Sequence, residues 1–138
     1  MSDLMKKMKP FMLVTDLGFL TYWAVSALVL VGFNVVPEAY LFKDYHEPIM
    51  KAWNWSYLPL DVVLSVCGLL SLRRYRQGDP SWRILATFSL SLTFCAGLMA
   101  ISFWTIRLDF DPTWWIPNLF FAIWPCFFLP GLATGSDL

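Results

Sequence analysis

The sequence is poor in charge. Only 14% of its 138 residues are Asp, Glu, Lys or Arg, whereas 58% are hydrophobic. Soluble globular proteins carry about 25% charged residues, so this composition excludes an ordinary water-soluble domain. The formal net charge is zero, which excludes the basic field that attracts nucleic acid. The length predicts a single membrane domain, residues 1–138.

Residues that build metal sites and disulfide frameworks are also scarce. The chain has one histidine, His46, and three cysteines, each inside an apolar run. An odd number of cysteines without a close pair argues against a disulfide framework, and no zinc-site spacing surrounds the histidine. A Gly-rich phosphate loop, a nucleophile elbow and an HExxH motif are missing. We therefore expect no metal, no cofactor and no catalytic residue, and an enzyme is the least favoured class of function.

Long apolar runs fill most of the chain. A helix needs about 20 apolar residues to cross a bilayer. Four stretches meet that length, residues 11–33, 53–72, 84–106 and 114–133. Backbone polar groups in lipid must be satisfied within their own segment, so the sequence predicts an all-α fold. Because the second and third links are short, we expect an antiparallel four-helix membrane bundle.

The distribution of Lys and Arg predicts the orientation of this bundle. Seven of the basic residues are expected on one side and three on the other. The seven are Lys6, Lys7, Lys9, Arg73, Arg74, Arg76 and Arg83, and the three are Lys43, Lys51 and Arg107. The positive-inside rule then places both termini in the cytoplasm. Five tryptophans gather near the opposite, outer interface and are interpreted as an aromatic belt: Trp53, Trp55, Trp104, Trp114 and Trp115.

The first loop, residues 34–52, is longer than a bare turn requires. Aromatic residues alternate there with charged ones, and two prolines interrupt it. We expect a short amphipathic element that lies at the outer interface and covers the mouth of the bundle. Glu38, Tyr45 and His46 are candidate ligand contacts in this loop. For His46 the alternatives are a solvated loop residue and a pH-responsive group.

Asp61 is the most informative single residue. It lies near the expected midplane of the second span, where a carboxylate costs about 2.5–3.5 kcal/mol, so it should face the bundle and hold a partner or a proton. Steps of three and four residues place it on one helix face with Asn54, Tyr57, Ser65 and Gly68. Two interpretations stay open, a ligand or proton site and a polar contact that holds helices together.

Asp16 leaves two alternatives of its own. Either it reaches the cytoplasmic interface or pairs with Arg73 or Arg74, or it lies in the bundle on the face of Trp23. The prolines of the fourth span predict kinks, which open cavities, and Asn118 there serves either helix packing or a ligand. The predicted ligand-contacting residues are Asp61, Asp16, Trp23, Glu38, Tyr45, His46, Asn54, Trp55, Tyr57, Asn118 and Trp124.

Three segments combine rare polar residues with aromatic ones: VTDLGFLTYW, PEAYLFKDYHEPIMKAWNWSYLPLDVVLS and DFDPTWWIPNLFFAIWPCFFLP. Through them most of the chain resembles the YvaD-like family of small bacterial four-span membrane proteins of unassigned function. The resemblance implies four spans in a bacterial inner membrane and supplies no activity. A weaker, architectural likeness is to the EXPERA group, which includes emopamil-binding sterol isomerases and the sigma-2 receptor. It implies acids within the bundle that hold cationic or sterol-like ligands, here Glu38, Asp61 and Asp16.

Three functions remain open from the sequence. Aromatic residues around a carboxylate suit an amphipathic ligand, lipid-like or cationic, bound in the bundle with Asp61 as its counter-charge. The alternatives are a small proton-coupled exporter and an accessory subunit whose polar residues only hold helices together. Expected partners are membrane lipid, a hydrophobic or cationic small molecule and, as an open alternative, a second copy of the chain; nucleic acid is not expected.

Overall fold

The computed structural model describes residues 2–136, and within them it contains helices and no strand. The elements are α1 (Asp3–Leu30), the 3-10 turn η1 (Glu38–Tyr40), α2 (Pro48–Ser56), α3 (Leu58–Arg76), α4 (Trp82–Ile106) and α5 (Pro112–Thr134). Because α2 runs almost directly into α3, the described chain has four helical units long and apolar enough to cross a membrane. The prediction of an all-α fold with four helices of this kind is confirmed.

Helix caps explain why the helices begin outside the predicted apolar runs. α1 begins at Asp3 because the Ser2 side chain accepts a hydrogen bond from the backbone N–H of Met5 at 3.3 Å. α2 begins at Pro48 because the Glu47 side chain accepts from the N–H of Met50 at 2.7 Å, and proline suits the first turn. The first loop is therefore shorter than residues 34–52, and its one regular element is η1.

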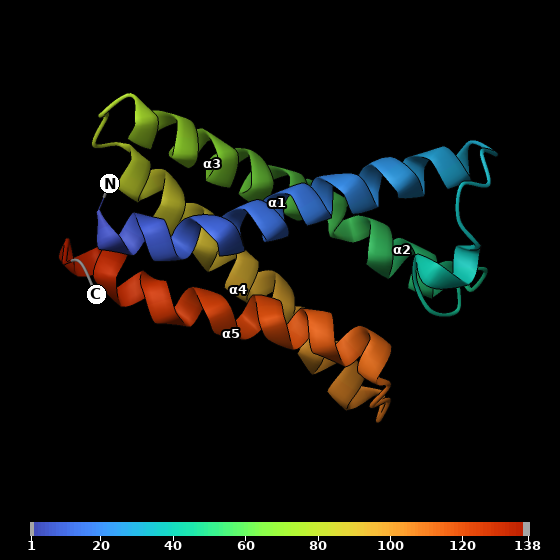
Figure 1. Cartoon of the computed structure of the whole chain (residues 1–138). Helices are drawn as coiled ribbons and strands as arrows, with labels where there is room; N and C mark the ends of the chain where they lie inside the picture. Colours follow the sequence, from blue (N-terminus) through green and yellow to red (C-terminus); the bar gives the residue numbers. More distant parts are fainter. Residues whose placement is uncertain (1, 137–138) are drawn as a thin grey trace.

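Pro59 separates α2 from α3. A proline has no backbone N–H and its ring obstructs the preceding turn, so an α-helix bends or ends there. The break falls at Tyr57, and Pro59 occupies the first turn of α3. Asp61 consequently lies in the first turn of α3, beside the bend rather than inside an uninterrupted helix. Figure 1 shows α2 continuing from α3 at an angle.

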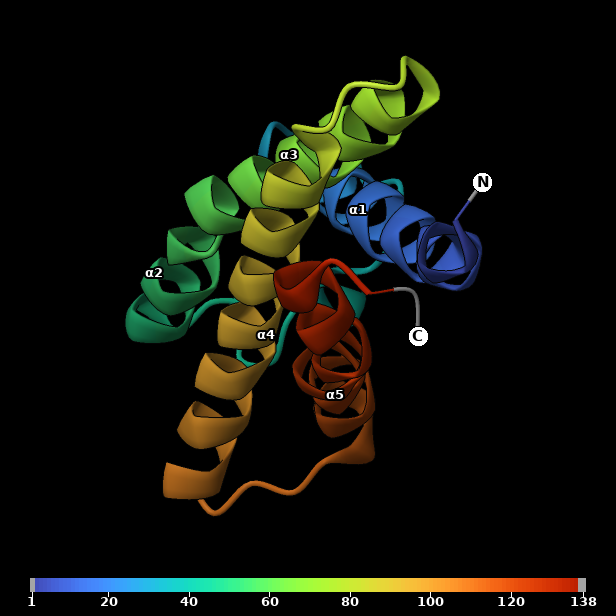
Figure 2. The same ribbon diagram turned by 90° about the vertical axis from the view of Figure 1, so that its left-hand side faces the viewer.

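The helices pack in the order α1, α3, α4 and α5. α4 makes its most extensive contacts with α5 and α3, and α1 packs mainly on α3. Figure 2, viewed from the side of the termini, shows α4 between α3 and α5. α1 and α5 lie together near the N- and C-termini and diverge toward the other end (Figure 1). We call these the terminal end and the loop end; the loop end carries the links 31–47 and 107–111.

Two hydrogen bonds at different heights fix the antiparallel register of α3 and α4. Between α3 and α4, the hydroxyl of Ser71 donates to the carbonyl of Trp82 at 2.8 Å, and the hydroxyl of Ser89 donates to the carbonyl of Leu64 at 2.7 Å. A serine that bonds a neighbouring helix satisfies its hydroxyl without water, as a membrane-spanning bundle requires.

The terminal end is filled by a continuous apolar cluster of methionine, leucine and aromatic side chains. Its buried members are Leu4, Met5, Met8, Met12, Leu72, Trp82, Ala86, Leu90, Trp124, Phe128 and Leu132. Flexible methionines fill irregular gaps between helices, so this end packs without a large void. A smaller cluster at the loop end contains Val29, Leu41 and Phe42. Dense packing at one end and diverging helices at the other leave room for a cavity.

Gly97 provides a test of the α4–α5 contact. A Cβ at this position would lie 2.5 Å from the backbone N of Ala122 and 2.6 Å from the carbonyl oxygen of Asn118. Gly97→Ala should therefore destabilise the bundle by roughly 1–3 kcal/mol, as overpacking does. At Gly18 nothing lies within 4 Å of an added Cβ, so Gly18→Ala is the matched control. Unfolding in detergent checks the pair; equal stability of the two variants would contradict the described α4–α5 packing.

Candidate functional site

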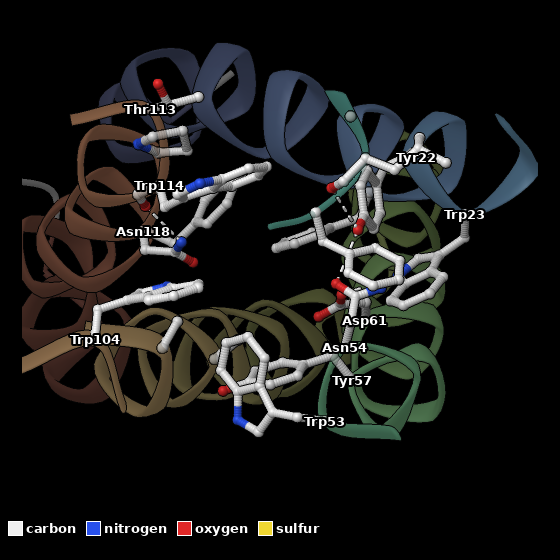
Figure 3. Close-up of a pocket in the computed structure, with 18 of the residues that line it drawn as sticks. Tyr22, Trp23, Trp53, Asn54, Tyr57, Asp61, Trp104, Thr113, Trp114 and Asn118 are labelled. Atoms are coloured by element: carbon white, nitrogen blue, oxygen red, sulfur yellow. Dashed lines mark hydrogen bonds between the residues drawn. The ribbon is translucent and has the colours of Figure 1, made fainter. Parts of the chain in front are cut away.

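A cavity of about 430 Å³ lies at the loop end, between the five α-helices and the first loop. Its aromatic lining includes Phe19, Trp23, Trp53, Trp104, Trp114 and Phe121. Its polar lining includes Tyr22, Asn54, Tyr57, Asp61, Thr113 and Asn118. In Figure 3 two groups of side chains face each other across this space, one from α1, α2 and α3 and the other from α4 and α5.

Asp61 is held in the wall of the cavity by one hydrogen bond. Its side chain is 3% exposed, and Oδ2 accepts from the indole Nε1 of Trp23 at 2.9 Å. Trp23 is fixed in turn by Trp55, whose ring centroid lies 5.2 Å away. The second carboxyl oxygen, Oδ1, has no hydrogen-bond partner. Asp61 thus presents one oxygen that α1 satisfies and one that remains available.

Three further cavity residues carry buried polar atoms without a partner. They are Nδ2 of Asn54, the hydroxyl of Tyr57 and Nε1 of Trp104. Leaving a buried polar group unsatisfied costs about 1–3 kcal/mol. With Oδ1 of Asp61, the cavity offers one acceptor, two N–H donors and a hydroxyl that can do either.

The first loop is fastened to the helices by Tyr22. Its hydroxyl lies 3.0 Å from the carbonyl oxygen of Leu41 and 2.9 Å from Oδ1 of Asn54, either of which can accept its proton. This contact turns the Asn54 amide nitrogen away from Tyr22 and brings the loop segment around Leu41 and Phe42 into the cavity wall. The loop is therefore part of the site.

Two ion pairs cross between the loops at the mouth. Lys43 Nζ lies 2.5 Å from Asp109 Oδ2, and Arg107 Nη2 lies 3.2 Å from Asp44 Oδ2. The hydrogen bond with Lys43 holds the pKa of Asp109 below its usual range, and the same contact raises the pKa of Lys43. These pairs, which we call the mouth pairs, tie the link 31–47 to the link 107–111.

Five of the predicted ligand-contacting residues line this cavity: Trp23, Asn54, Tyr57, Asp61 and Asn118. Asn118 donates one amide hydrogen to its own helix, through a hydrogen bond of 2.7 Å from Nδ2 to the carbonyl of Trp114. The other predicted residues do not line the cavity. Trp55 packs on the ring of Trp23.

Three predicted residues of the first loop and one of α5 do not line the cavity. His46 Nε2 lies 2.7 Å from Glu38 Oε2, in a pair whose histidine side chain is 83% exposed. Tyr45 stacks on Phe42, with ring centroids 4.6 Å apart. Trp124 belongs to the apolar cluster of the terminal end. A role in the cavity for these side chains would need a rearrangement of the loop or of α5.

Asp16 is buried in the bundle, which corrects one of the two sequence interpretations. Its side chain is 1% exposed and packs against Gly68 of α3, so it neither reaches an interface nor pairs with an arginine. Arg74 is paired instead with Asp79, at 2.7 Å. The sequence left both alternatives open because the start of α1 at Asp3, which puts Asp16 halfway along the helix, was not predicted.

Several residues of the cavity were not among the predicted ligand contacts. Tyr22, Trp53, Trp104 and Trp114 all line it. The last three were interpreted as a belt at the membrane interface, yet Trp104 is only 2% exposed. Tyr22 could have been found from its position next to Trp23. The inward tryptophans carried no such signal, because interfacial and cavity-lining tryptophans occur at the same helix ends.

The described residues contain no group of three or more His, Cys, Asp or Glu side chains placed to hold a metal ion. The described lining of the cavity supplies hydrogen-bonding groups, aromatic faces and the carboxyl of Asp61.

These features define a small helical protein with an aromatic, acid-containing cavity between apolar helices. Residues 8–137 match the family model described as a family of unknown function, DUF5360, and the chain belongs to this family. It is also 49% identical to the uncharacterized protein YvaD of Bacillus subtilis (strain 168) over 125 residues, which cover 91% of this chain and 90% of that protein. The resemblance inferred from the three sequence segments is confirmed. No solved structure matches the chain significantly.

The mouth pairs generate a prediction about access to the cavity. Ala100 lines the cavity and is only 3% exposed, so Ala100→Cys, with the three native cysteines replaced by serine, reports access of a charged thiol reagent to the cavity. Asp109→Asn breaks the pair with Lys43 and should speed labelling a few-fold, the modest effect expected of an exposed ion pair. The control is Asp79→Asn, which breaks a pair at the opposite end. Equal rates in all three backgrounds would show that the mouth pairs do not restrict entry.

The pair between Lys43 and Asp109 should also resist mild acid. Because the pKa of Asp109 is lowered in the folded protein, its contribution is fully present above the ordinary aspartate value of 3.8 and is lost as the pH falls below it. The labelling rate of the engineered cysteine, corrected for the fraction of thiolate, should therefore stay low from neutral pH to about pH 5. Faster corrected labelling across that interval would place the pKa of Asp109 above the expected range.

Proposed function

We propose that this protein is a multi-pass membrane protein, with both termini cytoplasmic, that binds an amphipathic cation in the loop-end cavity with Asp61 as the counter-charge. The observation that supports this function best is the free Oδ1 of Asp61 in an aromatic cavity, together with the unpartnered atoms of Asn54, Tyr57 and Trp104. A lipid-like amine has both the charge and the apolar body that such a site accepts.

Charge and shape both favour a cation. Among the described residues that line the cavity, Asp61 carries the one carboxylate, and no Lys, Arg or His is present. Indole faces attract cations by their quadrupole, and tryptophan does so best. The volume of about 430 Å³ lies within the 300–1,000 Å³ typical of small-molecule sites. A neutral ligand would use the aromatic walls but leave the carboxyl oxygen unsatisfied.

The membrane orientation rests on the charge distribution. The basic residues at the terminal end outnumber those at the loop end by seven to three, so the positive-inside rule puts the termini in the cytoplasm. Large apolar side chains cover the outside of the helices, among them Val14, Leu17, Val66, Met99, Ile116 and Phe127. In this orientation the cavity faces the non-cytoplasmic side, and in a bacterium its ligand would come from the outer face of the inner membrane.

A proton-coupled exporter is the second candidate, and the buried carboxyl of Asp16 favours it. Export also requires a route through the terminal end, where the methionine-rich cluster closes the bundle. Binding requires no such route, so we place it first. An accessory subunit would need neither the cavity nor the free carboxyl oxygen.

Thermal unfolding in lipid nanodiscs tests the binding function. A series from benzyltrimethylammonium to tetraphenylphosphonium should raise the unfolding temperature, since a ligand at 100 times its Kd stabilises the folded state by about 2.7 kcal/mol. Tetraphenylmethane, which is similar in shape and uncharged, should give a much smaller rise. Asp61→Asn should abolish the difference between the charged and neutral probes.

The matched control is Asp3→Asn, which removes an exposed carboxylate from α1. Its response to the cations should equal that of the unmodified protein. A series without any rise, or an identical rise in Asp61→Asn, would refute cation binding at this site. Cation flux in proteoliposomes that depends on a pH gradient would instead support the exporter.

A further inference from the structure

A second buried acid lies outside the cavity. Asp16 is halfway along α1, and its side chain is 1% exposed. Nothing in the binding function uses it. An aspartate buried among membrane-spanning helices is costly unless it holds a partner or a proton, so its surroundings indicate which of these applies.

The carboxyl of Asp16 packs directly against Gly68. A Cβ built on Gly68 would lie 1.9 Å from Oδ2 of Asp16 and 2.9 Å from the hydroxyl oxygen of Ser89. Any side chain at position 68 would therefore displace the carboxyl. The absence of a side chain brings α1 and α3 close together, and the carboxyl of Asp16 occupies the space that is left.

No donor satisfies this carboxyl. Oδ2 of Asp16 is buried without a hydrogen-bond partner. The hydroxyl of Ser89 donates its hydrogen to the carbonyl of Leu64 at 2.7 Å. Its oxygen can therefore accept a hydrogen bond from Asp16 but cannot donate one to it. An ionised carboxylate in this position has neither counter-charge nor donor, and burial then strongly favours the neutral acid. A protonated carboxyl can instead donate its own hydrogen to an oxygen such as that of Ser89.

We propose that Asp16 is a proton-binding site, and that its proton is released when a cation occupies the cavity beside Asp61. The α1–α3 register sets the distance between the two acids. Trp23 of α1 donates a hydrogen bond to Asp61 of α3, and Asp16 of α1 packs against Gly68 of α3. Gly68 follows Asp61 by seven residues, which at 1.5 Å per residue separates the two acids by about 10 Å along the helices. The proton site stands without the proposed function, whereas the coupling rests on it.

Phe19 and Ser65 lie between the levels of the two acids along α1 and α3. Phe19 lines the cavity and packs on Phe121, with ring centroids 4.6 Å apart. Ser65 is one turn from Asp61 on the buried face of α3, and its hydroxyl has no hydrogen-bond partner. A hydroxyl in that position can pass a proton between the level of Asp16 and the cavity. On release, the O–H bond of Asp16 breaks, the carboxylate keeps the electron pair, and the proton goes to water at the cavity.

The expected strength of coupling follows from the separation. Two unit charges about 10 Å apart, at an effective dielectric constant of about 20, change each other's binding equilibrium by roughly tenfold. The effect is reciprocal, so deprotonation of Asp16 strengthens cation binding by the same factor.

Other titratable groups must be separated from this effect. The thiol of Cys67 lies within electrostatic range of Asp16, and the phenols of Tyr22 and Tyr57 lie within range of Asp61. Each of them is neutral when protonated, and the ordinary values of both residue types lie above neutral pH. They should therefore stay neutral where Asp16 changes charge.

Infrared spectroscopy tests the proton site directly. In nanodiscs at neutral pH, the carbonyl-stretch band of a protonated carboxyl should be present, and one component should vanish in Asp16→Asn. Asp3→Asn, an exposed carboxylate on the same helix, should leave that component unchanged. Gly68→Ala should shift it, because the added Cβ displaces the carboxyl, while Gly18→Ala should not. Identical protonated-carboxyl bands in Asp16→Asn and the unmodified protein would overturn the proposal.

Proton release tests the coupling. Adding tetraphenylphosphonium to the protein in weak buffer with a pH indicator should release protons, and Asp16→Asn should release fewer. In the unmodified protein, the affinity for the cation should rise between acidic and alkaline pH. In Asp16→Asn this rise should be about tenfold smaller, since the amide stays neutral. Equal release from both proteins would overturn the coupling. Absence of any cation binding would defeat the proposed function and with it the coupling, but the infrared result would still decide the proton site.

Discussion

The hydrogen bond from Trp23 to Asp61 determines how α1 and α3 meet, and the cavity depends on it. A carboxylate in an apolar bundle needs a donor, and one indole N–H satisfies only one of its two oxygens. The bend at Pro59 places this acid in a first helical turn, where its side chain faces the space between diverging helices. The same contact that joins two helices therefore leaves one oxygen for something else.

The bundle is asymmetric along its length, and the asymmetry follows from side-chain size. At the terminal end, methionines and small residues such as Ala86 allow the helices to converge around one continuous cluster. Gly68 and Gly97 allow close approach midway. Toward the loop end, bulky aromatic side chains such as Trp53 and Trp104 line the cavity between the helices. The bundle is therefore densely packed at the terminal end and contains a cavity at the loop end.

Much of the architecture could be predicted from the sequence, because membrane helices are determined by length and apolarity alone. The face of the second span that carries Asn54 and Asp61 was also predictable from helical spacing, and both residues are buried. The depth of Asp16 was not, since it depends on a helix that begins at Asp3 among charged residues. The inward direction of Trp104 depends on how α4 and α5 cross, which no local pattern records.

The mouth pairs have a consequence for how the two loops can meet. Each loop contributes one cation and one anion to the mouth pairs, with Lys43 and Asp44 on one side and Arg107 and Asp109 on the other. Asp44 and Leu108 both adopt left-handed backbone conformations, with φ of 54° and 55°, which orient these charges. Docking the loops in the reversed sense would set like charges together. The two mouth pairs therefore favour the observed alignment of the two loops over the reversed one.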